Sequence, residues 1–97
     1  MSAQSGIVTA ANPVAIVNNG YMFQAGVMIA AFPSASSSVL VEMSTTATAA
    51  SNPGAANWVS WTLGTISSKA NLPILGAVMS FRITLESGTS AAWEVCG

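Results

Sequence analysis

Charged side chains are nearly missing from this 97-residue chain. It has two basic residues, three acidic residues and no histidine. Charged residues therefore make up 5% of the chain, against about 25% in an ordinary soluble domain. Aspartate is absent as well. Without His or Asp the chain lacks the Ser-His-Asp and Cys-His catalytic arrangements and any His-containing metal site. We therefore expect no enzymatic activity, no cofactor and no bound metal.

The two cations, Lys69 and Arg82, are too few to bind a polyanion. This excludes electrostatic binding to nucleic acid or to an anionic membrane surface. The longest apolar runs, Gly26–Phe32 and Leu72–Met79, are far shorter than the roughly 20 residues that cross a bilayer. The first six residues have neither the positive charge nor the apolar stretch of a signal peptide. The expected partners therefore include neither nucleic acid nor membrane.

Cysteine occurs once, as Cys96 beside Gly97. A single thiol excludes an intrachain disulfide and a thiolate cage for a metal. Two interpretations stay open, a packing residue or a link between subunits, and the position favours packing. Because nothing in the chain requires an oxidising compartment, we expect synthesis in the cytoplasm without export.

The chain is rich instead in apolar residues, which reach 52%, and in serine and threonine. Runs such as 34–38 and 44–48 supply neutral polar groups that keep the surface wet. A Ser/Thr/Ala surface costs little to desolvate, and a net charge of −1 gives weak repulsion between molecules. The composition favours a protein that packs against copies of itself or against a larger scaffold. The alternative is a freely soluble all-β domain of unusual composition.

Strand patterns dominate the chain. In residues 78–86 apolar side chains alternate with polar ones, which predicts a strand with one face in a core. A short turn over 87–90 leads to residues 91–96, and we expect these two strands to pair as a hairpin. Further strands are predicted at residues 7–9, 14–17, 21–32, 39–46 and 58–66.

Breaker residues separate these strands at 18–20, 33–38, 49–57 and 67–73. Six or seven short antiparallel strands in one domain, residues 1–97, predict an all-β sandwich of the Ig-like or jelly-roll-like kind. Residues 1–20 are expected to form an extended arm or edge strands, because Pro13 lacks an amide donor. Edge strands are usually guarded by Lys, bulges or inward charges, and these are scarce here. Either loops and prolines cover the edges, or another chain does.

The three tryptophans divide by phase. Trp61 and Trp93 fall on the apolar phases of their predicted strands, which predicts core positions. Trp58 lies on the opposite phase and is a candidate for an interface or a rim.

Two methionines suggest a second apolar surface. Met22 and Met28 lie opposite Tyr21 and Phe23 in the predicted strand 21–32. A strand that is apolar on both faces is a candidate for burial on assembly.

Arg82 is the last interface candidate. It could bind a carboxylate of a partner in a bidentate pair, or pair across strands with Glu94, and the second interpretation is favoured. Glu42, Glu86 and Glu94 could form a glycosidase-like carboxylate pair, but the polar residues that would orient a substrate are scarce.

The second half of the chain carries a resemblance. From the predicted strand Trp58–Leu63 through Phe81–Ile83 and Ser87–Thr89 to Trp93, it is similar to the compact β-sandwich proteins that serve as accessory structural proteins of tailed bacteriophages. The resemblance covers about half of the chain and carries no motif over residue by residue.

The resemblance implies a virion component, such as a capsid cement (decoration) protein. Such a protein is often a trimer and binds the major capsid protein. A minor tail or spike protein is also compatible. The alternative is a carbohydrate- or receptor-binding module that uses Trp58, which would make a glycan its partner.

Overall fold

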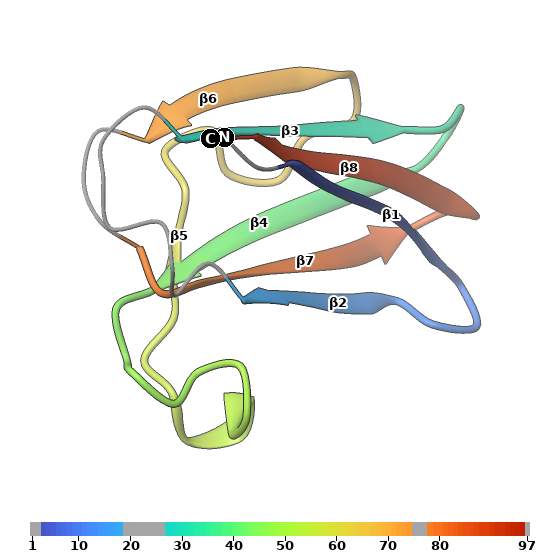
Figure 1. The fold of residues 1–97 in the computed structure, drawn as a ribbon. Coiled ribbons are helices and arrows are strands. Elements are labelled where there is room, and N and C mark those ends of the chain that lie inside the picture. Colours follow the sequence, from blue (N-terminus) through green and yellow to red (C-terminus); the bar gives the residue numbers. More distant parts are fainter. Residues whose placement is uncertain (1–2, 19–26, 75–77, 97) are drawn as a thin grey trace.

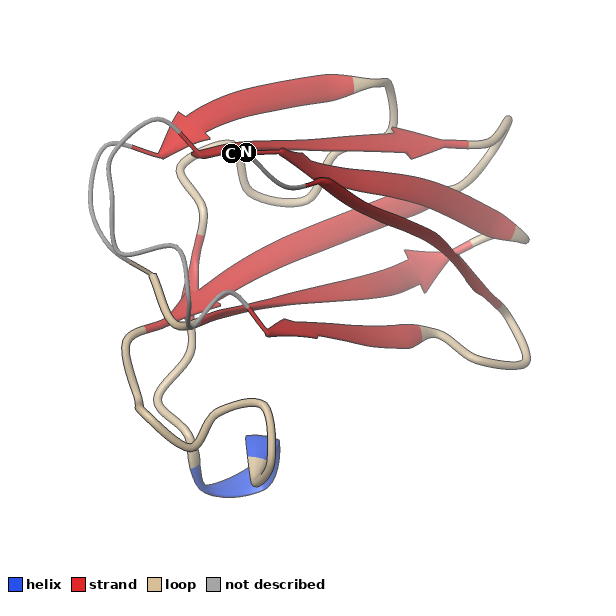
Figure 2. Cartoon of the chain, in the orientation of Figure 1, coloured by secondary structure: helices blue, strands red, loops and turns tan. Residues whose placement is uncertain are grey.

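The computed structural model describes residues 3–18, 27–74 and 78–96, and these form two layers of strands (Figure 1). Figure 2 shows that strands dominate the described chain, with one short helix of the 3₁₀ type. The strands are β1 (Ala3–Thr9), β2 (Val14–Asn18), β3 (Val27–Pro33), β4 (Ser38–Ser44), β5 (Val59–Ser60), β6 (Ala70–Ile74), β7 (Ser80–Ser87) and β8 (Ser90–Cys96); the helix η1 spans Pro53–Ala55.

The strands form two four-stranded antiparallel sheets that pack face to face. Their orders are β1-β8-β3-β6 and β2-β7-β4-β5. Apart from β4 and β5, consecutive strands lie in different sheets, so the chain passes back and forth across the core. This is the eight-stranded arrangement of a jelly roll rather than the strand order of an immunoglobulin domain. The predicted all-β sandwich is confirmed, and of its two named variants the jelly roll fits. It has eight strands rather than the predicted six or seven, because β6 forms in a segment predicted as a breaker.

The core lies between the sheets and follows the alternation of the sequence. In β7, Phe81, Ile83 and Leu85 are buried, as predicted. The other strands contribute residues on the same two-residue period, notably Ile29, Val41, Trp93 and Val95. Trp61 and Trp93 are both core residues, as predicted, but Trp61 lies just past β5, and Val59 and Leu63, predicted on the same face as Trp61, are exposed.

Trp93 fits because β1 has a glycine opposite it. Gly6 is the cross-strand neighbour of Trp93, and a Cβ on Gly6 would lie 2.8 Å from the Trp93 ring. That separation is shorter than a carbon–carbon contact allows. The missing side chain thus makes room for the indole.

The predicted hairpin of β7 and β8 is wrong. β7 pairs with β2 and β4, whereas β8 pairs with β1 and β3 in the other sheet. The turn between them crosses the sandwich, and the amide of Thr89 donates to the Ser37 hydroxyl at 3.0 Å instead of across a hairpin. Alternation reports which face of a strand is buried, not which strand lies beside it, so both arrangements fit the same pattern.

The predicted strand 58–66 is mostly wrong, because only Val59–Ser60 is strand. Gly64 has φ +65°, a left-handed conformation that ends the extended chain. The Trp61 indole N–H donates to the Gly64 carbonyl at 2.6 Å and closes this turn.

The segment 67–73, predicted as a breaker, contains most of β6. β6 pairs with β3 at the edge of its sheet, where Pro73 costs no ladder hydrogen bond because its nitrogen side can face away from the sheet. β3 confirms the second half of the predicted strand 21–32, while Tyr21, Phe23 and Gly26 lie outside the described residues. β1 and β2, from the first twenty residues, are edge strands of the two sheets.

Candidate interaction surfaces

The solvent side of the β1-β8-β3-β6 sheet is an apolar surface, which we call the β8 face. Register places its side chains in rows across the strands, with Ile7 beside Ala92 and Phe32, and Cys96 beside Met28. Ile7 is 65% exposed, Met28 39% and Phe32 37%. The only charged residue in these four strands is Glu94. Lys69, just before β6, shares a surface hollow with Phe32 and Asn71. The β8 face therefore combines exposed apolar side chains with two charges, Glu94 and Lys69.

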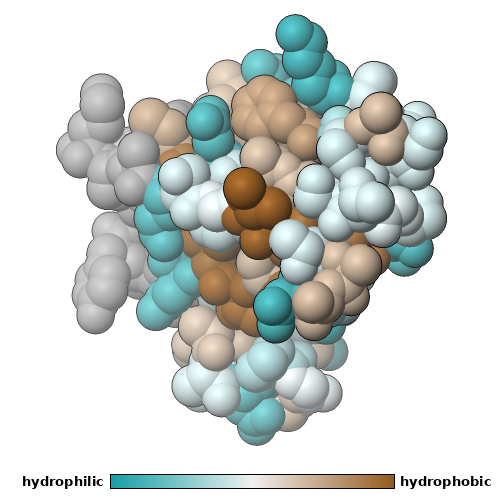
Figure 3. Space-filling model, turned by 90° about the vertical axis from the view of Figure 1, so that its right-hand side faces the viewer, coloured by the Kyte–Doolittle hydropathy of each residue, from teal (hydrophilic) through white to brown (hydrophobic). Residues whose placement is uncertain are grey.

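The end of the sandwich that carries the turns from β3 to β4 and from β7 to β8 is mixed, with several strongly hydrophilic residues among others of intermediate hydropathy (Figure 3). Figure 3 looks onto this end, where pale residues of intermediate hydropathy cover much of the surface and brown apolar side chains emerge between them. This agrees with a surface that is hydrated mainly through serine and threonine rather than through charged side chains.

The solvent side of the other sheet, the β7 face, carries an ion pair. Arg82 of β7 lies beside Glu42 of β4, and its Nε donates to Glu42 Oε1 at 2.8 Å, with Nη2 also 2.8 Å from the same oxygen. The predicted partner, Glu94, is wrong because Glu94 belongs to β8 in the opposite sheet. Register between β4 and β7, whose residues are 40 apart in sequence, brings Glu42 to Arg82.

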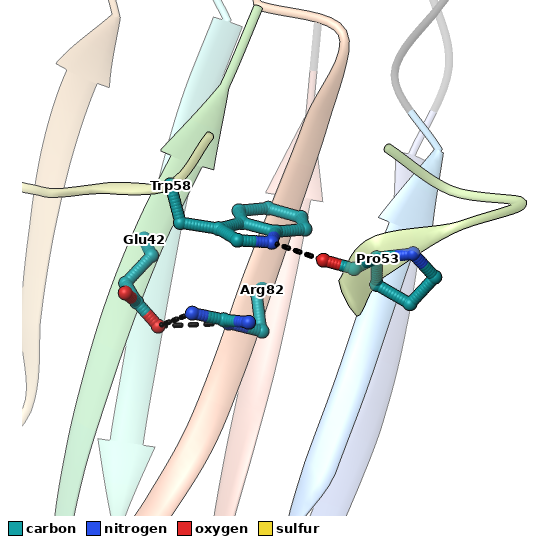
Figure 4. Close-up of polar contacts among 4 residues, drawn as sticks. All are labelled: Glu42, Pro53, Trp58 and Arg82. Atoms are coloured by element: carbon teal, nitrogen blue, oxygen red, sulfur yellow. Dashed lines mark hydrogen bonds and ion pairs between the residues drawn. The ribbon is translucent and has the colours of Figure 1, made fainter. Parts of the chain in front are cut away.

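Trp58 completes this cluster (Figure 4). The Arg82 guanidinium lies 4.6 Å from the centroid of the Trp58 ring, within the range of a cation–π contact. The indole N–H donates to the Pro53 carbonyl at 2.9 Å. Trp58 is half-buried, with one ring face over Arg82 and its polar edge bound to η1. Arg82 thus covers one ring face of Trp58, and Pro53 accepts from its N–H.

The three glutamates do not meet. Glu42 is on the β7 face and Glu94 on the β8 face, so their carboxylates point to opposite sides of the sandwich. Glu86 is the extra residue of a β-bulge in β7, where the register with β4 shifts. Among the described residues, the lining of the surface hollow of about 290 Å³ that contains Glu94 has no second carboxylate side chain.

The described part of the chain gathers no group of three or more His, Cys, Asp or Glu side chains that could hold a metal ion. Within the same residues, no helix has the length and apolarity to span a bilayer.

Of the four predicted interface residues, Met28 alone lies on the β8 face. Arg82 and Trp58 lie together on the β7 face side of the molecule, and Met22 lies outside the described residues. The prediction missed Ile7 and Phe32. For Phe32 the signal was available, since Met28, Ala30 and Phe32 alternate with the buried side of β3. An antiparallel strand that is apolar on both faces indicates a second surface to be covered.

Cys96 is an exposed free thiol at the end of β8. It lies beside Met28 in register and so belongs to the β8 face. It is not a core packing residue, and both a neighbouring contact and a link between subunits remain compatible with its position.

Comparison with known proteins finds likeness of fold without likeness of sequence. No protein-family model and no curated protein matches the chain. Among solved structures, the core of Drosophila NLP, described for pentamer formation and histone binding, has a TM-score of 0.56 at 13% identity and covers 98% of this chain and 95% of its own.

Two further structures align over nearly the whole chain. The mitogen of Yersinia pseudotuberculosis has a TM-score of 0.49 at 10% identity and covers 97% of this chain and 82% of its own. The C-terminal domain of A223, a structural protein of Sulfolobus turreted icosahedral virus, has a TM-score of 0.43 at 12% identity and covers 96% and 91%. At such identities, what the NLP core shares with this chain is the two-sheet fold.

Proposed function

We propose that this protein is a non-enzymatic structural component of a virus particle, of the capsid cement type, and that it binds the shell through the β8 face. It would be made in the host cytoplasm and reside in the virion. The resemblance of its second half to accessory proteins of tailed bacteriophages supports a phage particle as the partner.

The observation that carries the proposal is the exposed apolar surface of the β8 face. Of the six large hydrophobic side chains exposed among the described residues, Ile7, Met28 and Phe32 share this one face. An apolar patch with a polar surround is typical of a surface that another protein covers. Docking would have to desolvate two charges, Glu94 of β8 and Lys69, which shares a surface hollow with Phe32.

Energetics favour assembly over strong individual contacts. Covering serine, alanine and apolar side chains costs little free energy, whereas covering lysine or glutamate costs much more. Repetition of weak contacts over a shell gives avidity without any tight single site. A chain with five charged residues is suited to this mode of binding.

Substitutions on the two faces test the proposal. Phe32→Glu places a carboxylate on the β8 face, and we expect it to lower occupancy on shells assembled without the protein by about tenfold or more, because docking would have to desolvate the added charge. The matched control is Val14→Glu, which adds the same charge at the exposed Val14 of β2 in the other sheet. Co-sedimentation with the shells measures both variants.

The outcome that contradicts the proposal is equal binding of wild type and Phe32→Glu, or wild-type protein that does not bind shells at all. The mass of the purified protein in solution separately decides the oligomeric state. The trimer implied by the phage resemblance is one of its outcomes.

A further inference from the structure

One of the four sheet edges lacks the features that normally prevent strands from pairing between molecules. β5 is two residues long. β2 has five residues, and the Asn18 carbonyl at its end accepts from the Gln4 side chain at 3.3 Å. β6 contains Pro73 and follows Lys69. β1 is seven residues long, Ala3–Thr9, without a proline, a charged residue or a break in its register with β8. Edges of this kind are templates for another strand.

The direction of the backbone groups on β1 follows from its ladder. The amide of Ala10 donates to the Thr89 carbonyl, and the hydrogen-bonded positions of an antiparallel pair alternate. Val8, Gly6 and Gln4 therefore bond to β8, and the N–H and C=O groups of Ala3, Ser5 and Ile7 point outward. The N–H of Thr9 also points outward, but it donates to Asn12. Nothing in the described residues pairs with the outward backbone groups of Ser5 and Ile7.

We infer that β1 pairs with β1 of a second copy, antiparallel, about a twofold axis centred on Ser5. Ala3, Ser5 and Ile7 each present both an N–H and a C=O group outward, and Ser5 is the middle residue of the three. In this register Ser5 faces Ser5, and Ile7 faces Ala3 of the other copy. Since β1 carries no charge, no like charges meet on the axis, where repulsion would otherwise be strongest.

Such pairing joins two four-stranded sheets into one of eight strands and doubles the β8 face. At a rise of about 3.3 Å per residue and a strand spacing of about 4.8 Å, three strands of seven residues and one of five project an area of about 410 Å². A stable interface takes about 800 Å² from each partner. One β8 face is thus small for a shell contact, and two joined faces reach the usual size. In this respect the inference deepens the proposed function, although it is tested without any shell.

Cysteine crosslinking tests the register. In a Cys96→Ser background, Ser5→Cys places two thiols in facing positions with Cα atoms about 5.5 Å apart, within disulfide range. The matched control is Ile7→Cys, on the same strand and the same face, whose two copies would lie about 13 Å apart along the strands. We expect mild oxidation to convert Ser5→Cys to a covalent dimer at least about tenfold more completely than Ile7→Cys.

A second variant tests the pairing itself. Ser5→Pro removes an outward N–H and leaves the ladder with β8 intact, so we expect a monomer by light scattering where the wild type has twice the monomer mass. A monomeric wild type, equal crosslinking of the two cysteine variants, or a folded Ser5→Pro dimer would each overturn the inference. If Ser5→Pro does not fold, the crosslinking comparison decides alone. A wild-type dimer that binds no shell refutes the proposed function and supports the pairing of β1. A wild-type monomer that binds shells supports the proposed function and refutes the pairing.

Discussion

At the scale of single residues, serine holds the sandwich together at one end. Ser37 is 1% exposed, and its hydroxyl accepts from the amides of Thr89 and Ser90 at 3.0 and 3.4 Å. Ser34 bonds to Ser37 at 2.8 Å, so the turn from β3 to β4 is tied to the turn from β7 to β8. Gly88, with φ +93°, packs against Ser37, where a Cβ would collide with it. The serine run thus has a structural role beyond keeping the surface wet.

Ser37→Ala should lower the free energy of unfolding by about 1–3 kcal/mol, because the Thr89 amide loses its acceptor in a part-buried site. Chemical denaturation of wild type and variant measures the difference. The matched control, Ser68→Ala, lies on an exposed bend and should change the free energy by less than about 0.5 kcal/mol. Equal effects of the two substitutions would show that the Ser37 hydroxyl does not join the turns.

At the scale of elements, the connection between β4 and β5 is held by Trp58 rather than by regular structure. Residues 45–57 extend from the sheet of β7 away from the core (Figure 1). They contain η1 and a turn closed by the Asn52 amide, which donates to the Thr48 carbonyl at 2.8 Å. Trp58 connects the two parts, because its ring covers Arg82 while its N–H binds Pro53. The cluster therefore orders a loop that the sequence alone predicts only as irregular.

Trp58→Ala should lower the free energy of unfolding by about 1–3 kcal/mol through loss of the cation–π contact and the hydrogen bond. It should also make residues 45–57 the first site of limited proteolysis. Trp58→Phe keeps a ring over Arg82 but lacks the N–H. Its free energy of unfolding should lie between those of the wild type and Trp58→Ala. If the loop of Trp58→Ala resists protease as the wild type does, Trp58 does not hold it.

At the scale of the whole molecule, stability depends on apolar packing between the sheets. The Arg82–Glu42 pair is the ion pair found within the described residues, and five charges are spread over the entire chain. Because so few charge interactions contribute to the stability of this protein, screening them with salt should change that stability little.

We expect the melting temperature to shift by less than about 2 °C between about 0.05 and 0.5 M NaCl, a range over which the Debye length falls by roughly threefold. Calorimetry measures the shift. A change above about 5 °C would mean that charges contribute far more than packing suggests.

The sequence predicted which face of each strand is buried better than it predicted which strands lie side by side. The alternation in β4 and β7 correctly separated Val41 and Ile83 from Glu42 and Arg82, because burial on one side of a strand leaves a local pattern. Nothing local marks whether β8 lies beside β7 or across the core from it, and the Glu42–Arg82 contact depends on that long-range register. The same limit applies to the β8 face, where Met28 was predicted from its own strand but Ile7 arrives from β1.

The pairing of β1 with β8 has a consequence for how the chain reaches this fold. β1 forms its ladder with β8, so it has no partner in this sheet until residues 90–96 have been made. Closing so long a loop is entropically costly, and topologies dominated by distant pairings fold slowly, in milliseconds to seconds. During synthesis β1, which carries no charged residue, stays unpaired. In this period we expect the nascent chain to be most prone to aggregation.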